Sequence, residues 1–275
     1  MNKLLAANFM RLKKSKVFWG AAVFMAMIGF IFAILQKQTL DQGFEATLEG
    51  GVFQYVTFIG FVTAVFCAVF VGTEYSDGTL RNKIIVGHKR SEIYLSTFIV
   101  CALTAAAVCI LCMVCYLGLG AALLGGFASS LAAILPAAVC VIALSTCFSA
   151  IFTLIALLCH NKAASAVFCI LLALILLFAG SFLLSILDEP EFYGGYYMDE
   201  TGELRQEEMQ PNPRYVSGTT RKVYEVLLDV TPGGQQLQLA PGDVEKPWML
   251  TVYSIGLAAL ATACGMVFFK KKDLK

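Results

Sequence analysis

The chain alternates long apolar runs with short charged segments. Five stretches contain no Asp, Glu, Lys, Arg or His, and they cover residues 17–35, 52–73, 93–159, 163–187 and 248–269. A helix needs about 20 apolar residues to cross the hydrocarbon core of a bilayer. Four of the runs, 19 to 25 residues long, therefore predict one span each, whereas the 67-residue run must hold more than one.

Helix-breaking residues gather near the middle of the longest run, at Gly118, Gly120, Gly125, Gly126, Ser129 and Ser130. They favour two spans there, with a kink expected at Pro136 in the second. The first run follows basic residues, as in a signal peptide, but its length and the lack of a small-residue cleavage pattern favour a retained span. The sequence thus predicts an all-α membrane protein with one transmembrane domain over residues 1–275 and six spans, at about 17–35, 52–73, 93–117, 131–159, 163–187 and 248–269.

The charged residues are segregated between the two sides that these spans define. The formal net charge is only +1. With six spans, however, the N-terminal arm (1–16), the loops after spans two and four and the C-terminal tail share one side and carry a net charge of +10, against −9 for the opposite side. Basic loops remain in the cytoplasm. We therefore expect both termini to be cytoplasmic and segment 188–247 to be extracellular; a seventh span would place the basic tail outside, against this rule.

The composition agrees with a membrane protein and offers no catalytic motif. Hydrophobic residues make up 59% of the chain and charged residues 14%, too few charges for a soluble surface. The ten cysteines lie in or beside apolar stretches, and the spacing of Cys109, Cys112 and Cys115 is interpreted as helix packing rather than as a metal site. Neither HExxH nor GxxxxGK[ST] occurs. We expect no enzymatic activity, no metal and no cofactor in this chain.

One compact charged insert lies between spans two and three. Thr79–Val86 can form a short helix with Leu80 and Ile84 on one side, an N-cap at Ser76 or Asp77 and a C-cap at Gly87. Arg81 and Lys83 lie beside the apolar positions. Two interpretations remain open at this point: a solvated loop resting on lipid headgroups, or a contact surface for a cytoplasmic protein.

The stretch GTEYSDGTLRNKIIVGHKRSEIYLSTF, which begins at Gly72, resembles the cytoplasmic loop of ATP-binding-cassette (ABC) export permeases of the second type. The six-span order, the short basic N-terminal arm, the brief turn CHNKAAS and the long segment before the last span are also similar to that family. In the family this helix is the coupling helix, which fits a groove on the ATPase subunit. The resemblance implies that the ATPase contacts Glu74, Tyr75, Thr79, Leu80, Arg81, Lys83, Ile84 and Ile85.

The N-terminal arm is similar to the interfacial connecting helix of the same family. Leu5, Phe9 and Leu12 fall on one side of this helix, while Arg11 and Lys14 are expected to face away. The resemblance further implies a bacterial cell membrane, a soluble ABC ATPase that binds ATP and Mg²⁺, a second permease copy in a homodimer or heterodimer, and the lipid bilayer as partners. We expect no nucleic-acid partner.

The predicted function is therefore the membrane subunit of an ATP-driven exporter. A carrier or channel coupled to ions is the alternative, but no acidic or basic residue lies within a predicted span core, where ion relays need one. A membrane scaffold, such as an immunity protein that sequesters its target, is a third possibility. The sequence does not identify a substrate.

Segment 188–247 is acidic and rich in turn residues. A hairpin is expected at residues 196–206, and a helix from Thr219 or Thr220 carries Val223, Val226, Leu227 and Val230 at helical spacing. Pro232, Gly233 and Gly234 are expected to end that helix. Sixty residues with one amphipathic helix bury little core of their own, so we expect a lid that packs on the span ends or on a partner copy.

Overall fold

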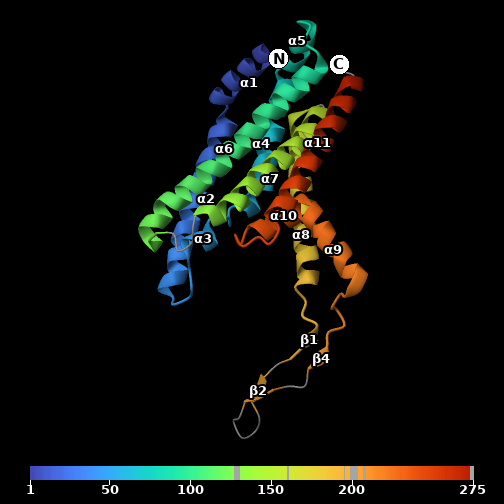
Figure 1. Ribbon diagram of the computed structural model, residues 1–275. Coiled ribbons are helices and arrows are strands. Elements are labelled where there is room, and N and C mark those ends of the chain that lie inside the picture. The colour runs from blue at the N-terminus through green and yellow to red at the C-terminus, as the bar shows by residue number, and fades with distance from the viewer. Residues whose placement is uncertain (127–130, 160, 195, 199–203, 207–208, 273–275) are drawn as a thin grey trace.

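Long helices form the body of the molecule in a computed structural model (Figure 1). The structure describes residues 1–126, 131–159, 161–194, 196–198, 204–206 and 209–272. Within them, six helical segments are long and apolar enough to cross a membrane. They are α2 (Lys16–Asp41), α3 (Leu48–Gly51) continued by α4 (Val56–Ser76), α6 (Arg90–Leu124), α7 (Leu131–Leu158), α8 (Lys162–Leu187) and α11 (Pro247–Lys271). The predicted all-α fold with six membrane helices is confirmed.

Two of the membrane helices extend beyond the predicted spans, about 52–73 and 93–117. Residues 48–51 form the separate helix α3, and α4 begins only at Val56. The third span does not end near residue 117, because α6 continues through Gly118 and Gly120 to Leu124. Gly120 leaves the room that Leu48 fills, since a Cβ there would lie 2.7 Å from the Leu48 methyl group. Glycine in this helix therefore permits close packing, and the helix stops at Gly125, whose φ is +89°.

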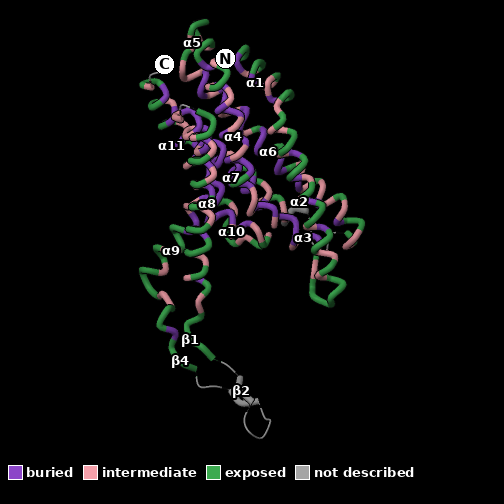
Figure 2. The backbone as a smooth tube through the Cα atoms, turned by 180° about the vertical axis from the view of Figure 1, so that it is seen from behind, coloured by how far each residue is buried: buried purple, intermediate pink, exposed green. Residues whose placement is uncertain are grey.

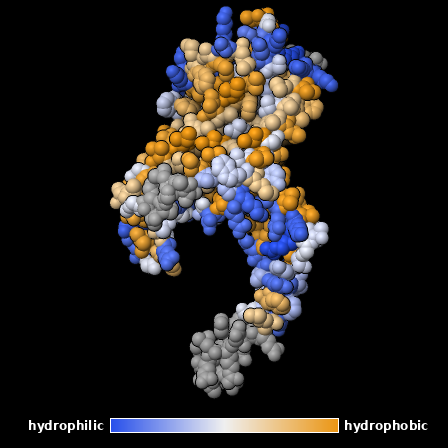
Figure 3. Space-filling view, viewed as in Figure 1, coloured by the Kyte–Doolittle hydropathy of each residue, from blue (hydrophilic) through white to orange (hydrophobic). Residues whose placement is uncertain are grey.

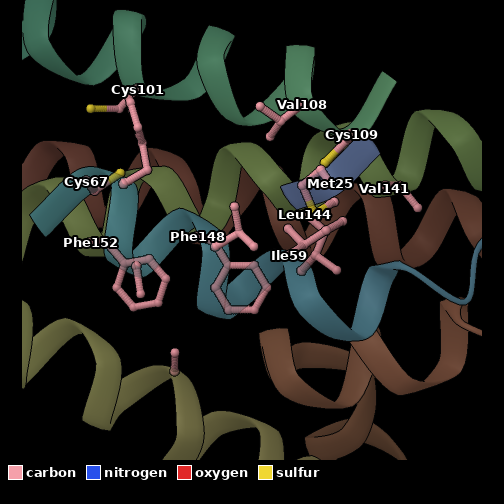
Figure 4. Packing of buried hydrophobic residues seen from close by; sticks show 14 of the residues in the cluster. Met25, Ile59, Cys67, Cys101, Val108, Cys109, Val141, Leu144, Phe148 and Phe152 are labelled. Atoms are coloured by element: carbon pink, nitrogen blue, oxygen red, sulfur yellow. The ribbon is translucent and has the colours of Figure 1, made fainter. Parts of the chain in front are cut away.

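The two central helices are α4 and α7. Each has 67% of its most apolar window buried inside the chain, compared with 22% for α2 and 17% for α8. Met25, Ile59, Leu144, Phe148 and Phe152 meet in this core (Figure 4). Around it α2 packs on α6, α8 on α4, and α11 on α7. Burial is concentrated between the helices (Figure 2), and apolar surface covers the middle of the molecule in Figure 3, as expected for helices in lipid.

Both ends of the described chain lie at the same end of the bundle, which we call the terminus face (Figure 1). This face carries α1 (Asn2–Lys14), α5 (Thr79–Ile85) and the last turn of α11. The opposite end, which we call the distal face, carries α3, α9 (Gly218–Val230), α10 (Pro232–Leu239) and four short strands. Terminal elements on one face agree with an even number of crossings.

Short strands on the distal face extend away from the bundle (Figure 1). The strands β1 (Phe192–Tyr193) and β4 (Gln210–Pro211) pair antiparallel, as do β2 (Tyr196–Met198) and β3 (Leu204–Gln206). The predicted pairing within residues 196–206 is therefore confirmed, although residues 199–203 lie outside the described part. The amide of Asn212 donates to Glu189 Oε2 at 2.9 Å and lowers the pKa of that carboxyl group.

The rest of the distal segment agrees with the prediction in part. Helix α9 ends at Val230, just before Pro232, Gly233 and Gly234, as expected, but these three residues also begin a second helix, α10, which was not predicted and packs against α8 and α4. This close approach depends on small residues, because a Cβ on Gly180 would lie 2.5 Å from the carbonyl carbon of Gly233. In α9 the buried residues are Leu228 and Asp229, while the predicted apolar positions Val223, Val226 and Leu227 are 44–51% exposed. The part that packs into the bundle is therefore mainly α10.

Candidate functional site

Two glycines with positive φ isolate α5 as a short rigid helix on the terminus face. Gly78 (φ +66°) separates α4 from α5, and Gly87 (φ +94°) follows the last turn. After α5 the amide of Gly87 donates to the carbonyl of Ile84 at 2.9 Å, and that of His88 donates to the carbonyl of Lys83 at 3.2 Å, the paired bonds of a Schellman motif. The C-cap is Val86 rather than the predicted Gly87, and Gly87 is the residue with positive φ that follows the cap. The predicted N-cap at Ser76 or Asp77 was wrong, because Gly78 holds that position and makes no side-chain cap bond.

The faces of α5 differ from the sequence prediction. Leu80 is only 2% exposed and belongs to the chain's own core, and Ile84 packs against the same core. Neither residue is therefore available as an exposed apolar surface. The exposed apolar residues at the end of α5 are Ile85, 71% exposed, and Val86, 76% exposed. Arg81 is exposed on the same short helix. The pattern could not show this, because Leu80 and Ile84 are as apolar as the residues that remain outside.

Glu74, at the end of α4, forms ion pairs that fix α5 to the rest of the terminus face. Its side chain is fully buried, and one oxygen, Oε1, accepts from Arg11 Nη1 and, at 2.6 Å, from Lys83 Nζ. Lys83 also donates to Asn8 Oδ1 at 3.0 Å. Breaking a buried ion pair by removing one partner typically costs 3–5 kcal/mol. Glu74 therefore holds α5 to α4 and α1 and is not exposed to another protein.

The position of Arg11 corrects the sequence prediction for α1. Arg11 does not face away from the molecule but pairs with Glu74 and lies over the ring of Phe70, 3.8 Å from its centroid. Leu12 is buried and Leu5 and Phe9 are half-buried against the core, whereas Lys14 is exposed. Sequence reasoning missed two further buried residues of this face, Leu4 and Asn8.

Tyr75, the next residue of α4, connects this end of α4 to the end of α7 and to the residue that follows α11. Its hydroxyl donates to the carbonyl of Leu157 at the end of α7. Lys272, which follows α11, donates to the Tyr75 hydroxyl at 2.8 Å and to the carbonyls of Leu157 and Cys159, each at 3.0 Å. Partial burial lowers the pKa of the Lys272 ammonium group to about 8. No pattern in the sequence indicates this contact, since Lys272 is one of several lysines in the tail.

Two further bonds complete the connections of α5. The hydroxyl of Thr79 donates to the carbonyl of Glu74 at 3.3 Å. The amide of Asn8 donates to Ser96 Oγ on α6, also at 3.3 Å. Contacts from α5 and the last turn of α4 thus reach α1, α7 and residue 272 directly, and α6 through Asn8. A displacement of α5 would be transmitted to most of the membrane helices.

The cysteines and histidines of the chain can be compared with the sequence interpretation. Within the described residues, no three His, Cys, Asp or Glu side chains gather as metal ligands. Cys109 and Cys112 are buried on α6 and Cys115 is half-buried; His160 lies outside the described residues. On the terminus face, the exposed part of α5 is its apolar and basic tip, formed by Arg81, Ile85 and Val86.

Six apolar helices with a short, rigidly held amphipathic helix between the second and the third define a multi-pass membrane protein of the permease class. The model of the ABC-2 family transporter protein matches residues 4–180, more than half of the 275 residues. The chain belongs to this family and is the membrane permease of an ABC transporter, and family membership implies association with an ABC ATPase. No curated protein matches the sequence.

Proposed function

We propose that this chain is the permease half of an ATP-driven exporter in a bacterial cell membrane. A separate soluble ATPase, which binds ATP and Mg²⁺, contacts α5 from the cytoplasm. Two permease copies, identical or related, form the path for the substrate between them. The absence of ionisable residues from the span cores supports an external motor over an ion-coupled carrier.

The exposed tip of α5 is the observation that carries this proposal. Ile85 and Val86 are among the most exposed large apolar residues of the described chain, and they lie on the face that carries both termini (Figure 1). Fully burying an aliphatic side chain of this size contributes about 1.5–3 kcal/mol. A hydrophobic pocket on the ATPase would gain this energy, and Arg81 beside it favours an acidic rim.

The connections behind α5 support a mechanism. Closure of two ATPases on ATP displaces whatever is bound to them. Because Glu74, Tyr75 and Lys83 fix α5 to neighbouring helices, a displacement of its tip moves these helices together rather than bending a loop. The same contacts give the predicted residues Glu74, Tyr75 and Lys83 a role as supports of the contact surface.

Co-purification tests the proposal. The chain is expressed with the soluble protein bearing GxxxxGK[ST] that a neighbouring reading frame encodes. Replacing Ile85 and Val86 by Asp is expected to reduce the recovered ATPase at least about tenfold, since two apolar contacts are lost. Asp at Val223 and Val226, two exposed positions on α9, is the matched control and should leave recovery unchanged.

Undiminished recovery of the ATPase with the α5 variant would overturn the assignment of this surface. Leu80 is unsuitable for the test, because an Asp in its buried position would disrupt the packing of α5 on the rest of the chain.

A further inference from the structure

A groove of about 380 Å³ lies between α1 and α5 on the terminus face. Lys3, Leu4, Ala7, Asn8 and Arg11 line it from α1, and Thr79, Asn82, Lys83, Val86 and His88 line it from α5 and the residues after it. Three of these side chains are cationic, and the rest include two amides, one hydroxyl and one imidazole. No carboxylate is among them. The exposed surface between these side chains is largely apolar, so the groove is suited to an anion that also carries an apolar part.

The positive charge of the groove is only partly neutralised. Glu74 pairs with both Arg11 and Lys83, so one carboxylate faces two cations. Lys3 is exposed and makes no ion pair within the described residues. The groove therefore keeps a net charge of about +2, which a phosphate monoester or diester would offset.

Arg11 provides more specific evidence that the groove binds an anion. Glu74 accepts from Nη1 of this guanidinium group through Oε1, while Nε and Nη2 of Arg11, and Oε2 of Glu74 as well, are buried and have no hydrogen-bond partner within the described residues, so two donors face one remaining acceptor. The N–H groups of Nε and Nη2 point to the same side of the planar guanidinium group and can bind two oxygens of one phosphate. Buried donors without an acceptor are costly. A bound phosphate oxygen would remove that cost after a small turn of the side chain toward the groove.

The surroundings of the groove identify the source of the phosphate as a lipid. The amphipathic α1 leads through Ser15 directly into the membrane helix α2. Met10 and Trp19, 65% and 58% exposed, lie near this junction, and Trp is typical of the membrane interface. Arg11, the groove residue nearest in sequence to Ser15, belongs to the last turn of α1 directly before this junction. Basic clusters at the membrane interface attract anionic lipids, at about 1 kcal/mol per Lys or Arg.

We propose that the α1–α5 groove binds the phosphate of an anionic phospholipid, with Arg11 and Lys3 as its principal ligands. The bound headgroup would fasten α1 to α5 and so stiffen the surface proposed to contact the ATPase. This inference stands apart from the proposed function, because lipid binding requires no ATPase.

The test measures binding to the purified full-length chain in a neutral detergent, without ATPase. Soluble dioctanoyl-phosphatidylglycerol is titrated while thermal unfolding is followed. Dioctanoyl-phosphatidylcholine tests for the need for negative charge, and inorganic phosphate tests for a free anion. We expect a saturable stabilisation by the phosphatidylglycerol alone.

Three variants locate the site. Lys3→Gln removes one cation, and Arg11→Lys keeps the charge that pairs with Glu74 but removes the planar guanidinium group. Each is expected to weaken binding at least about fivefold, the equivalent of about 1 kcal/mol. Lys13→Gln is the matched control, since Lys13 is an exposed base on the same helix that does not line the groove; it should change affinity less than about twofold.

Each other outcome overturns the proposal. Equal effects of Lys3→Gln and Lys13→Gln would show diffuse attraction to a basic surface. Equal stabilisation by inorganic phosphate would show a general anion site, and stabilisation by the phosphatidylcholine would show binding through the acyl chains. No stabilisation by any of the three ligands would show that the groove is not a site for them.

Discussion

Glu74 shows how one residue can combine two tasks at the terminus face. One oxygen of its buried carboxylate, Oε1, accepts from Arg11 of α1 and from Lys83 of α5, so Glu74 neutralises charge and fixes geometry at once. A carboxylate placed at this depth is stable only because both partners are present. The sequence identified Glu74 as a site residue through the resemblance, whereas its role as a buried anchor follows from the structure.

Replacing Glu74 by Gln tests this role. The substitution keeps the size of the side chain but leaves Arg11 and Lys83 without their counter-ion, so the free energy of unfolding should fall by about 3 kcal/mol. Thermal unfolding of the purified chain measures the change. Glu225→Gln is the control, because Glu225 forms an exposed pair with Arg221 at 3.3 Å and its loss should cost less than about 1 kcal/mol. Similar losses in both variants would contradict the anchoring role.

At the scale of the element, α5 depends on the glycines that bound it. Seven residues cannot form a stable helix alone. The helix persists because Leu80 is buried, Lys83 is paired, and Gly87 reverses the chain at its end. The loop therefore behaves as part of the packed body, as a surface that transmits force must.

Gly87→Ala should loosen α5 without removing any side-chain contact. An alanine at φ +94° costs about 1–2 kcal/mol, and no atom lies near enough to add a steric clash. Hydrogen exchange of the α5 amides should therefore accelerate by about tenfold, while the exchange of α4 is unchanged. Gly256→Ala in α11 also meets open space but has helical geometry. It serves as the control, and equal acceleration of α5 exchange there would contradict the explanation.

For the whole molecule, α5 and α9 lie at opposite ends of the bundle (Figure 1), so we expect them on opposite sides of the membrane. Charge segregation predicts that α5 is cytoplasmic. Cysteines introduced at Ile85 and Val223, both exposed, should therefore react with a membrane-impermeant maleimide from different sides. In intact cells Val223→Cys should be labelled and Ile85→Cys should not.

The native thiols must not obscure this result. Seven of the ten are buried, and Cys264 is exposed on the membrane helix α11, away from water. Cys115 and Cys159 are half-buried. Cys159, at the end of α7, is therefore replaced by Ser in both variants, and the chain without new cysteines supplies the background. Labelling of Ile85→Cys in intact cells would place α5 outside and exclude contact with a cytoplasmic ATPase.

The sequence by itself determined the number of membrane helices, their approximate places and the existence of α5, because the length of an apolar run and the positions of glycine act locally. It did not determine where α6 ends, or that α10 packs into the bundle, since Gly120, Gly180 and Gly233 owe their roles to residues distant in the chain. Apolar residues look alike in the sequence whether they face lipid, core or partner.

Only the tertiary structure decided which face of each amphipathic helix is free. It turned Leu80 inward and left Ile85 and Val86 outside, and it brought Arg11 to Glu74 although Arg11 was expected to face away. The physical reason is that a helical pattern fixes the angle between side chains but not the rotation of the helix. That rotation is set by what the neighbouring helices offer, here a buried carboxylate at the end of α4 that needs two cations.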